Sequence, residues 1–188
     1  MSLRKIELTL GNGTIGWGVT WSYPRDDGNL YKIPIYSLKV EGEDDGGKQQ
    51  TKTFEAFRFG VHRPTAGAVA QVVGLADEQT HTIKAWIEDY SVHSARSLEK
   101  GAWKVYSNFL IHDGPDDPKD VNEPYASIGC VEICKGPAGF DEFNNFIISL
   151  SGSKKSSRNE KLKEIGSSGK MAIKYLKASR PPLTIYHP

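Results

Sequence analysis

The chain has 188 residues, of which 38% are hydrophobic and 25% are charged, and its formal net charge is +1. This size and composition predict a single domain over residues 1–188, in which we distinguish an N-terminal β-rich half (1–99) from a C-terminal half (100–188). The near-neutral charge gives no basis for nucleic-acid binding, and no apolar run is long enough for membrane insertion. Two cysteines are too few for a disulfide scaffold.

The first half of the sequence predicts strands separated by turns. Alternating polar and apolar residues predict a strand over 5–10, closed by Gly11–Gly13, and aromatic and β-branched residues predict another over 15–23. A third strand is predicted over 30–40, where Pro34 indicates a sheet edge or a bulge. The charged, glycine-rich stretch 41–52 predicts a flexible loop.

Further strand patterns lead up to a histidine. Residues 54–61 alternate again, residues 80–90 predict one strand or two short ones, and residues 101–112 predict a strand or hairpin that ends at His112. No convincing helix precedes this point.

The pattern changes after residue 139. Helical spacing of the apolar residues over 143–150 predicts a helix that Asp141 caps and Gly152 ends. A second helical region is predicted over 159–177, interrupted at 166–169, and a closing strand over 183–186. The predicted fold is therefore mainly β (α+β), a twisted sheet or sandwich with two helical segments in the C-terminal part.

The segment between Phe109 and Cys134 carries the candidate chemistry. His112 ends an apolar strand, and Cys130 follows a compact turn that contains Ser127 and Gly129. A cysteine nucleophile needs a base that raises the thiolate fraction, and backbone N–H groups in such a turn can stabilise an oxyanion. The alternative is that Cys130 is a buried structural thiol, which is the commoner role of an isolated cysteine.

The acidic loop 113–120 has three interpretations. It is a solvated turn, it recognises an amine, or it orients His112 through Asp113. The remaining histidines have ordinary surroundings: His62, His81, His93 and His187. Cys130 and Cys134 lack partners with zinc-ligand spacing, so we predict no metal and no cofactor.

The order histidine, loop, Ser-x-Gly-Cys and an apolar residue resembles the catalytic domain of the L,D-transpeptidase (YkuD-type) family. The family motif is a histidine, a gap of about a dozen or more residues, and then Ser-His-Gly-Cys-[Ile/Val]-Arg. His112 matches the first histidine, and Ser127, Gly129, Cys130 and Val131 match positions of the second part. The resemblance covers the chain from about residue 100 to the end, including a Gly-aromatic strand before the histidine and a helix after the cysteine.

Two positions depart from the family pattern. Ile128 stands where the motif has its second histidine, and Glu132 stands where it has an arginine that helps to bind or organise the site. The resemblance therefore indicates a divergent member. We assign substrate contact to Asp113, Tyr125 and Glu132, which flank the catalytic histidine and cysteine.

The resemblance implies an acyl transfer on peptidoglycan stem peptides. Cys130 would attack a carbonyl, His112 would act as base and then as acid, and the N–H groups of Gly129 and Cys130 would hold the oxyanion. Water as acceptor gives an L,D-carboxypeptidase, and an amine gives an L,D-transpeptidase.

The site of action implied is the periplasm or cell envelope, yet the N-terminus does not read as a signal peptide. Export as an antibacterial effector by a type VI route would reconcile the two, with secretion machinery or an immunity protein as partners. Two rival functions remain. One is a non-catalytic β-rich binding module with a structural Cys130, and the other is a papain-like amidase, in which the cysteine normally precedes the histidine.

Overall fold

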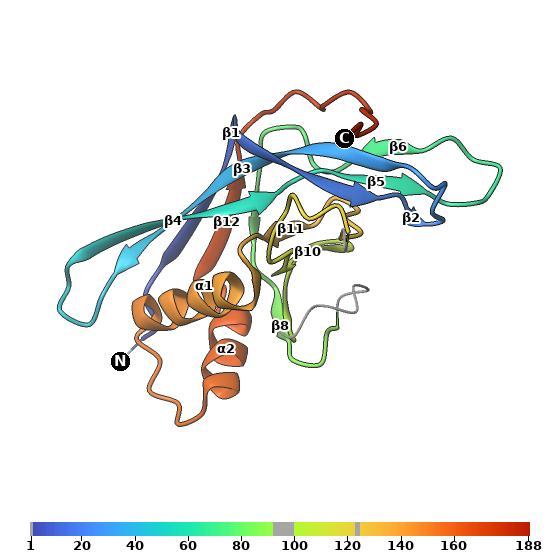
Figure 1. The fold of residues 1–188 in the computed structure, drawn as a ribbon. Helices are drawn as coiled ribbons and strands as arrows, with labels where there is room; N and C mark the ends of the chain where they lie inside the picture. Colours follow the sequence, from blue (N-terminus) through green and yellow to red (C-terminus); the bar gives the residue numbers. More distant parts are fainter. Residues whose placement is uncertain (1, 92–99, 123–124) are drawn as a thin grey trace.

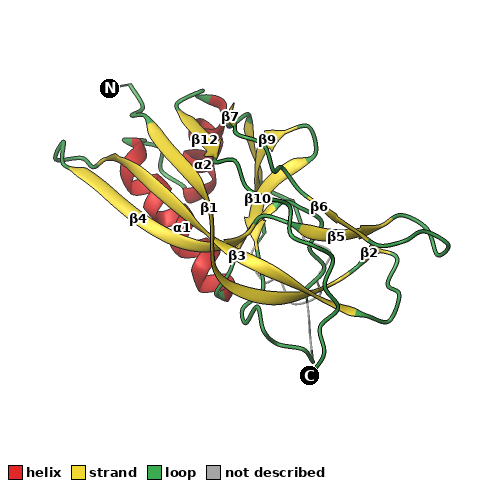
Figure 2. Cartoon of the chain, turned by 90° about the horizontal axis from the view of Figure 1, so that it is seen from above, coloured by secondary structure: helices red, strands yellow, loops and turns green. Residues whose placement is uncertain are grey.

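A mainly β architecture with two late helices confirms the predicted fold class. A computed structural model of the protein describes residues 2–91, 100–122 and 125–188. Its two sheets are mixed, and the helices lie together on one side of the long strands (Figure 1). Viewed from above, α1 lies beneath β1, β3 and β4, α2 lies near β12, and the smaller sheet lies towards the other end of the molecule (Figure 2).

The larger sheet has nine strands in the order β7-β12-β1-β3-β4-β11-β10-β9-β8. The bounds of its strands in chain order are β1 (Ile6–Trp21), β3 (Leu30–Glu43), β4 (Gln49–Phe57), β7 (Gln79–Thr82), β8 (Ala85–Ile87), β9 (Ala102–Tyr106), β10 (Phe109–Asp113), β11 (Val131–Ile133) and β12 (Met171–Tyr175). The smaller sheet has the order β2-β5-β6, with β2 (Tyr23–Pro24), β5 (Gly60–Arg63) and β6 (Gln71–Val73).

One short segment ties together the two ends of the larger sheet. Strand β7 pairs with β12 at one end, and β8, which follows two residues later, pairs with β9 at the other. The sheet therefore curls around a common interior. Residues 80–90 were predicted to form one strand or two short ones, and the structure has two, β7 and β8.

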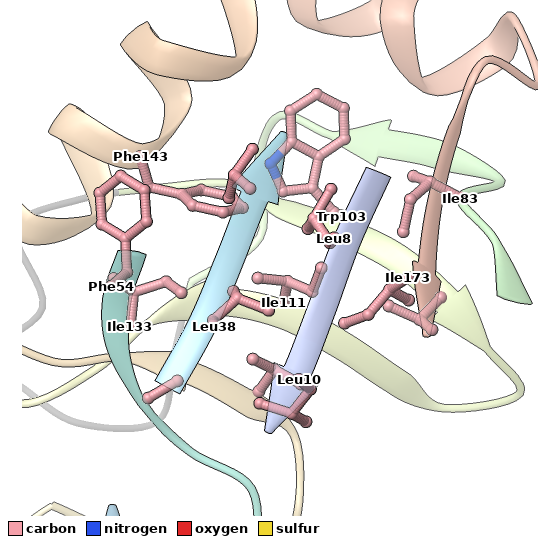
Figure 3. Packing of buried hydrophobic residues seen from close by; sticks show 14 of the residues in the cluster. Leu8, Leu10, Leu38, Phe54, Ile83, Trp103, Ile111, Ile133, Phe143 and Ile173 are labelled. Carbon is pink, nitrogen blue, oxygen red and sulfur yellow. The ribbon is translucent and has the colours of Figure 1, made fainter. Parts of the chain in front are cut away.

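The interior of this curl holds the main hydrophobic core. Figure 3 shows Leu8, Trp103, Ile111 and Ile173 converging from four different strands, and the cluster extends along the chain from Ile6 to Ala178. Because side chains alternate along a strand, Ile111 faces this core and its neighbour His112 faces the opposite side of the sheet.

The helices begin and end differently from the prediction. Helix α1 (Gly136–Ser151) starts after Lys135, which adopts a left-handed φ of 78°, so the expected cap at Asp141 is wrong. The predicted end is confirmed, since Gly152 closes the helix with φ 72°. Helix α2 (Arg158–Ser167) has a capping box formed by Ser157 and Glu160.

The predicted second helical region is too long. Residues 171–175 form β12, which pairs in parallel with the first residues of β1, and its apolar side chains alternate with a period of two. The Lys and Ala residues in this stretch favoured a helix locally, but burial against β1 decides the outcome.

Two turn predictions are also wrong. The Gly11–Gly13 stretch does not close a strand, because β1 runs through it with register shifts against β3 between Leu10 and Gly16. The expected flexible loop 41–52 is a hairpin in which Asp44 and Lys48 form the turn between β3 and β4. The predicted closing strand over 183–186 is reduced to a bridge between Ile185 and Tyr31.

A buried hydrogen bond joins α1 to the sheet and generates a stability prediction. The Trp103 indole Nε1–H donates to Asn144 Oδ1 at 2.8 Å, and both residues are buried. We expect Asn144→Ala to lower the free energy of unfolding by about 1–3 kcal/mol, since the indole N–H is left without an acceptor. Urea unfolding measures this change. The exposed neighbour Asn145 provides the control, where Asn145→Ala should change stability by less than about 0.5 kcal/mol; equal losses at both positions would contradict the assignment.

Candidate active site

The candidate site lies where β10 and β11 run side by side in parallel. The register pairs Ile111 with Val131 and His112 with Glu132. Paired residues of neighbouring strands point to the same face, so His112 and Glu132 project together from the face opposite the main core. Their side chains are 1% and 0% exposed, respectively.

The His112 ring is held by the backbone of the next residue. Its Nδ1 lies 2.7 Å from the Asp113 carbonyl oxygen. A carbonyl can only accept, so Nδ1 carries the hydrogen and donates it, and in the neutral ring Nε2 is the nitrogen without a proton. This is the tautomer that a general base acting through Nε2 requires.

The Asp113 carbonyl is itself fixed by a second donor. The Tyr125 hydroxyl donates to it at 3.0 Å, and the Trp21 N–H donates to the Tyr125 carbonyl at 3.0 Å. Tyr125 therefore links β1 to the acceptor that orients His112. The structure gives Tyr125 this contact, whereas its expected contact with substrate remains a prediction.

Ser127 is clamped between two strands. Its N–H donates to the Thr20 hydroxyl at 2.8 Å, and its carbonyl accepts from the Val61 N–H at 2.8 Å. A Cβ at Gly60 would lie 2.1 Å from that carbonyl, so the approach requires a glycine there. The hydroxyl is buried and directed to the Phe59 carbonyl at 3.4 Å.

Gly129 meets a second glycine at close range. Its φ is +96°, and a Cβ there would lie 2.9 Å from the Gly74 Cα atom. Both the backbone conformation and the contact therefore exclude larger residues. The turn that precedes Cys130 depends on this pair.

The Cys130 thiol lies level with the beginning of β10. Its Sγ is 3.9 Å from the Asn108 carbonyl oxygen, and its side chain is 7% exposed. The backbone N–H of Leu110 is directed to the thiol. His112 follows Leu110 by two residues on β10. The thiol therefore contacts the strand that carries the imidazole.

Burial keeps the Cys130 thiol protonated. It raises the pKa of Cys130 to about 12, and the negative charge of Glu132 adds to this, whereas the Leu110 N–H works in the opposite direction. A resting thiolate is therefore scarce at neutral pH, and attack by Cys130 requires a base to take its proton.

Glu132 is the most unusual group in the cluster. No described residue forms a hydrogen bond to either of its carboxyl oxygens, and Oε1 lies 3.9 Å from His112 Nε2. Burial raises the pKa of Glu132 well above its ordinary value. The Ser127 hydroxyl, which approaches the carboxyl without meeting hydrogen-bond geometry, partly offsets this rise, and the Asp113 carboxyl adds to it. A fully buried side chain does not contact substrate unless the site opens, so the substrate contact expected of Glu132 remains a prediction. In this structure the Glu132 carboxyl lies next to the His112 ring.

Tyr90 was not anticipated from the sequence. Its ring centroid lies 5.4 Å from that of His112, and burial together with the charges of Cys130 and Glu132 raises the pKa of its hydroxyl to about 12. Tyr90, Thr20, Gly60 and Gly74 come from four separate segments, and no local pattern marks them. Only the fold brings them to the motif.

Cys134 does not pair with Cys130. Both thiols are unpaired, and the extended strand between them separates their Cα atoms by about 13 Å, whereas a disulfide needs less than about 7 Å. Among the other histidines, His81 stacks on Tyr106 and His62 lies in β5, while His93 lies outside the described residues.

The described part of the chain contains no cluster of three or more His, Cys, Asp or Glu side chains arranged to hold a metal ion. Nor does any helix within residues 2–91, 100–122 and 125–188 have the length and apolarity needed to cross a membrane. Comparison with protein-family models, with curated proteins and with solved structures finds no match to this chain.

The Gly129–Gly74 contact gives a prediction about folding. We expect Gly129→Ala to lower the free energy of unfolding by about 1–3 kcal/mol, because alanine is strained at this φ and its methyl group overlaps Gly74. Gly67 is exposed, with open space around it, so Gly67→Ala serves as control and should not destabilise by more than about 0.5 kcal/mol. Thermal or urea unfolding compares the two; equal stability of both variants would contradict the packing.

The buried carboxyl predicts a stability that falls with pH. The pKa of Glu132 is higher in the folded chain than in the unfolded chain, so its contribution is fully present below about pH 4.3 and is lost as pH rises through the folded pKa. Relative to the native protein, Glu132→Gln should gain up to about 1.4 kcal/mol per pH unit across this window. Urea unfolding between pH 4 and pH 8 measures the difference, and a constant offset would contradict a raised pKa.

Proposed function

We propose that the protein is a cysteine-dependent acyl transferase of the L,D-transpeptidase type that acts on peptidoglycan stem peptides. One observation carries the proposal, which is the contact of His112 Nδ1 with the Asp113 carbonyl, on the same strand whose Leu110 N–H is directed to the Cys130 thiol. It leaves Nε2 as the proton acceptor in the neutral ring, which is the tautomer that a general base acting through Nε2 requires.

The proposed reaction has two acyl-transfer steps. As Cys130 Sγ attacks the peptide carbonyl, its proton moves to His112 Nε2, and the N–H groups of the Gly129–Cys130 turn stabilise the oxyanion. Collapse of the tetrahedral intermediate breaks the C–N bond, and His112 returns the proton to the leaving amine. The resulting thioester is then attacked by water or by an acceptor amine, which gives hydrolysis or cross-linking.

Several neighbours would keep this machinery in place. Tyr125 fixes the carbonyl that orients His112, and Ser127 is anchored to both β1 and β5, so the turn before Cys130 is preorganised. We assign Asp113 and Tyr125 to positioning in the resting site. The proposed site of action is the periplasm or cell envelope, with delivery as an antibacterial effector and an immunity protein as partner.

A second candidate function is a binding module in which Cys130 is structural. The low exposure and the raised pKa of this thiol favour it. A groove of about 620 Å³, lined by Trp17, Tyr36 and Arg180 among others, would give such a module a surface on which to bind a partner.

The test of the proposed function compares the two buried cysteines. We expect a muropeptide with a tetrapeptide stem to give a thioester adduct on Cys130, detected by intact-protein and peptide mass spectrometry, and to be hydrolysed or cross-linked. Cys130→Ala should abolish both products, whereas Cys134→Ala should retain them because Cys134 lies about 13 Å along the strand.

The binding-module candidate makes the opposite prediction. It expects no adduct on Cys130 and equal muropeptide turnover, at background level, for the native protein and Cys130→Ala. That result would reject the acyl transferase, provided that both variants show native circular dichroism.

A further inference from the structure

The Glu132 carboxyl has a position that the acyl-transfer chemistry does not explain. It is 0% exposed, and neither oxygen receives a hydrogen bond from a described residue. A carboxylate buried in this way is costly unless it is protonated or paired with a cation. Within the described residues, no lysine or arginine forms an ion pair with it.

The Glu132 carboxyl lies close to the nitrogen that the proposed base uses. Glu132 Oε1 is 3.9 Å from His112 Nε2, about 1 Å longer than a hydrogen bond, so the two atoms must approach by about 1 Å to share a proton. The register of two paired strands imposes this approach, since His112 and Glu132 are directly opposite each other on β10 and β11.

Within the described residues, the other titratable groups placed around the pair add no positive charge. The Asp113 carboxyl approaches from β10, the Cys130 and Cys134 thiols flank β11 on either side, and the Tyr90 hydroxyl approaches from the segment after β8. All of these groups are neutral or negative. The imidazole of His112 is therefore the group in the described cluster that can carry a positive charge beside the carboxylate.

We propose that Glu132 and His112 share one buried proton, and that this proton decides whether His112 can deprotonate Cys130. While the pair holds this proton, the proton resides on the Glu132 carboxyl or on His112 Nε2, and Nε2 does not accept a second proton. When solvent base removes it, the carboxylate faces a neutral imidazole. The Cys130 S–H bond can then break as the Nε2–H bond forms, and the carboxylate stabilises the resulting imidazolium.

Glu132 is thus a positioning residue that acts through His112. This inference rests on the proposed function for its biological meaning, but the proton-sharing pair can be measured without any peptidoglycan substrate. The consequence is a site whose thiol becomes reactive only above a threshold pH, which Glu132 sets.

The test is the rate of Cys130 alkylation by iodoacetamide between pH 5 and pH 10, measured by peptide mass spectrometry in the Cys134→Ala background. Glu132→Gln cannot hold the shared proton and removes a negative charge beside the thiol. We expect the inflection in its plot of alkylation rate against pH to move to lower pH by about one unit or more. Glu132→Asp keeps an ionisable carboxyl and should remain closer to the native profile.

The control is Glu55, a half-buried carboxylate on the adjacent strand β4 that pairs with Lys135. Glu55→Gln should leave the alkylation profile unchanged. Superimposable profiles for Glu132→Gln and the native protein, with both folded by circular dichroism, would overturn the proton-sharing pair.

The same experiment separates this inference from the proposed function. A shifted profile in a protein that does not turn over muropeptides would retain the pair and reject the acyl transferase. Muropeptide turnover with an unshifted profile would retain the enzyme and reject the pair.

Discussion

The parallel pairing of β10 with β11 is the constraint on which the site depends. Parallel neighbours cannot be joined by a tight turn, so the chain must cross over between them. The described parts of that crossover are residues 114–122 and 125–130, and the second part carries the Ser127–Cys130 turn. Both parts are bonded to other strands, since Val19 and Trp21 of β1 donate to Pro118 and Tyr125, and Val61 of β5 donates to Ser127. These hydrogen bonds hold Pro118, Tyr125 and Ser127 against the sheets.

The energetics of the cluster explain why its parts must act together. Burial holds the pKa of the Cys130 thiol far above neutral pH, so a pre-formed thiolate is scarce. In the proposed reaction, proton transfer to His112 therefore accompanies attack. The Cys130 thiol is therefore unreactive until it loses its proton. The buried carboxyl of Glu132 raises the pKa of this thiol further.

Local patterns predicted those parts of the molecule in which local preference and tertiary packing agree. The 101–112 hairpin, the two short strands over 80–90 and the end of α1 at Gly152 all followed from alternation or from glycine chemistry. Residues 171–175 were mispredicted because their composition suits a helix, while the parallel partner that makes them a strand lies more than 160 positions away in β1. The beginning of α1 was missed because a lysine in a left-handed conformation carries no recognisable cap signal.

The sequence motif of the candidate site could be predicted, but the spatial arrangement of the residues around it could not. The order of His112 and Cys130 drew attention to the segment in which the candidate site lies, and Glu132 stood out as a departure from the family pattern. The acceptor that orients His112 is a backbone carbonyl, and every residue has one, so no sequence pattern could identify it. The contacts that fix it come from Tyr125 and from distant residues of β1, which only the crossover brings together.

The orientation of His112 is the central claim, and the ring nitrogens report on it directly. In protein labelled with ¹⁵N at histidine, two-dimensional NMR distinguishes a protonated from an unprotonated ring nitrogen by its chemical shift. At a pH where the ring is neutral, the account predicts that His112 carries its proton on Nδ1, with Nε2 unprotonated. A neutral His112 with its proton on Nε2 would contradict the account, because that nitrogen could not then accept the proton of Cys130.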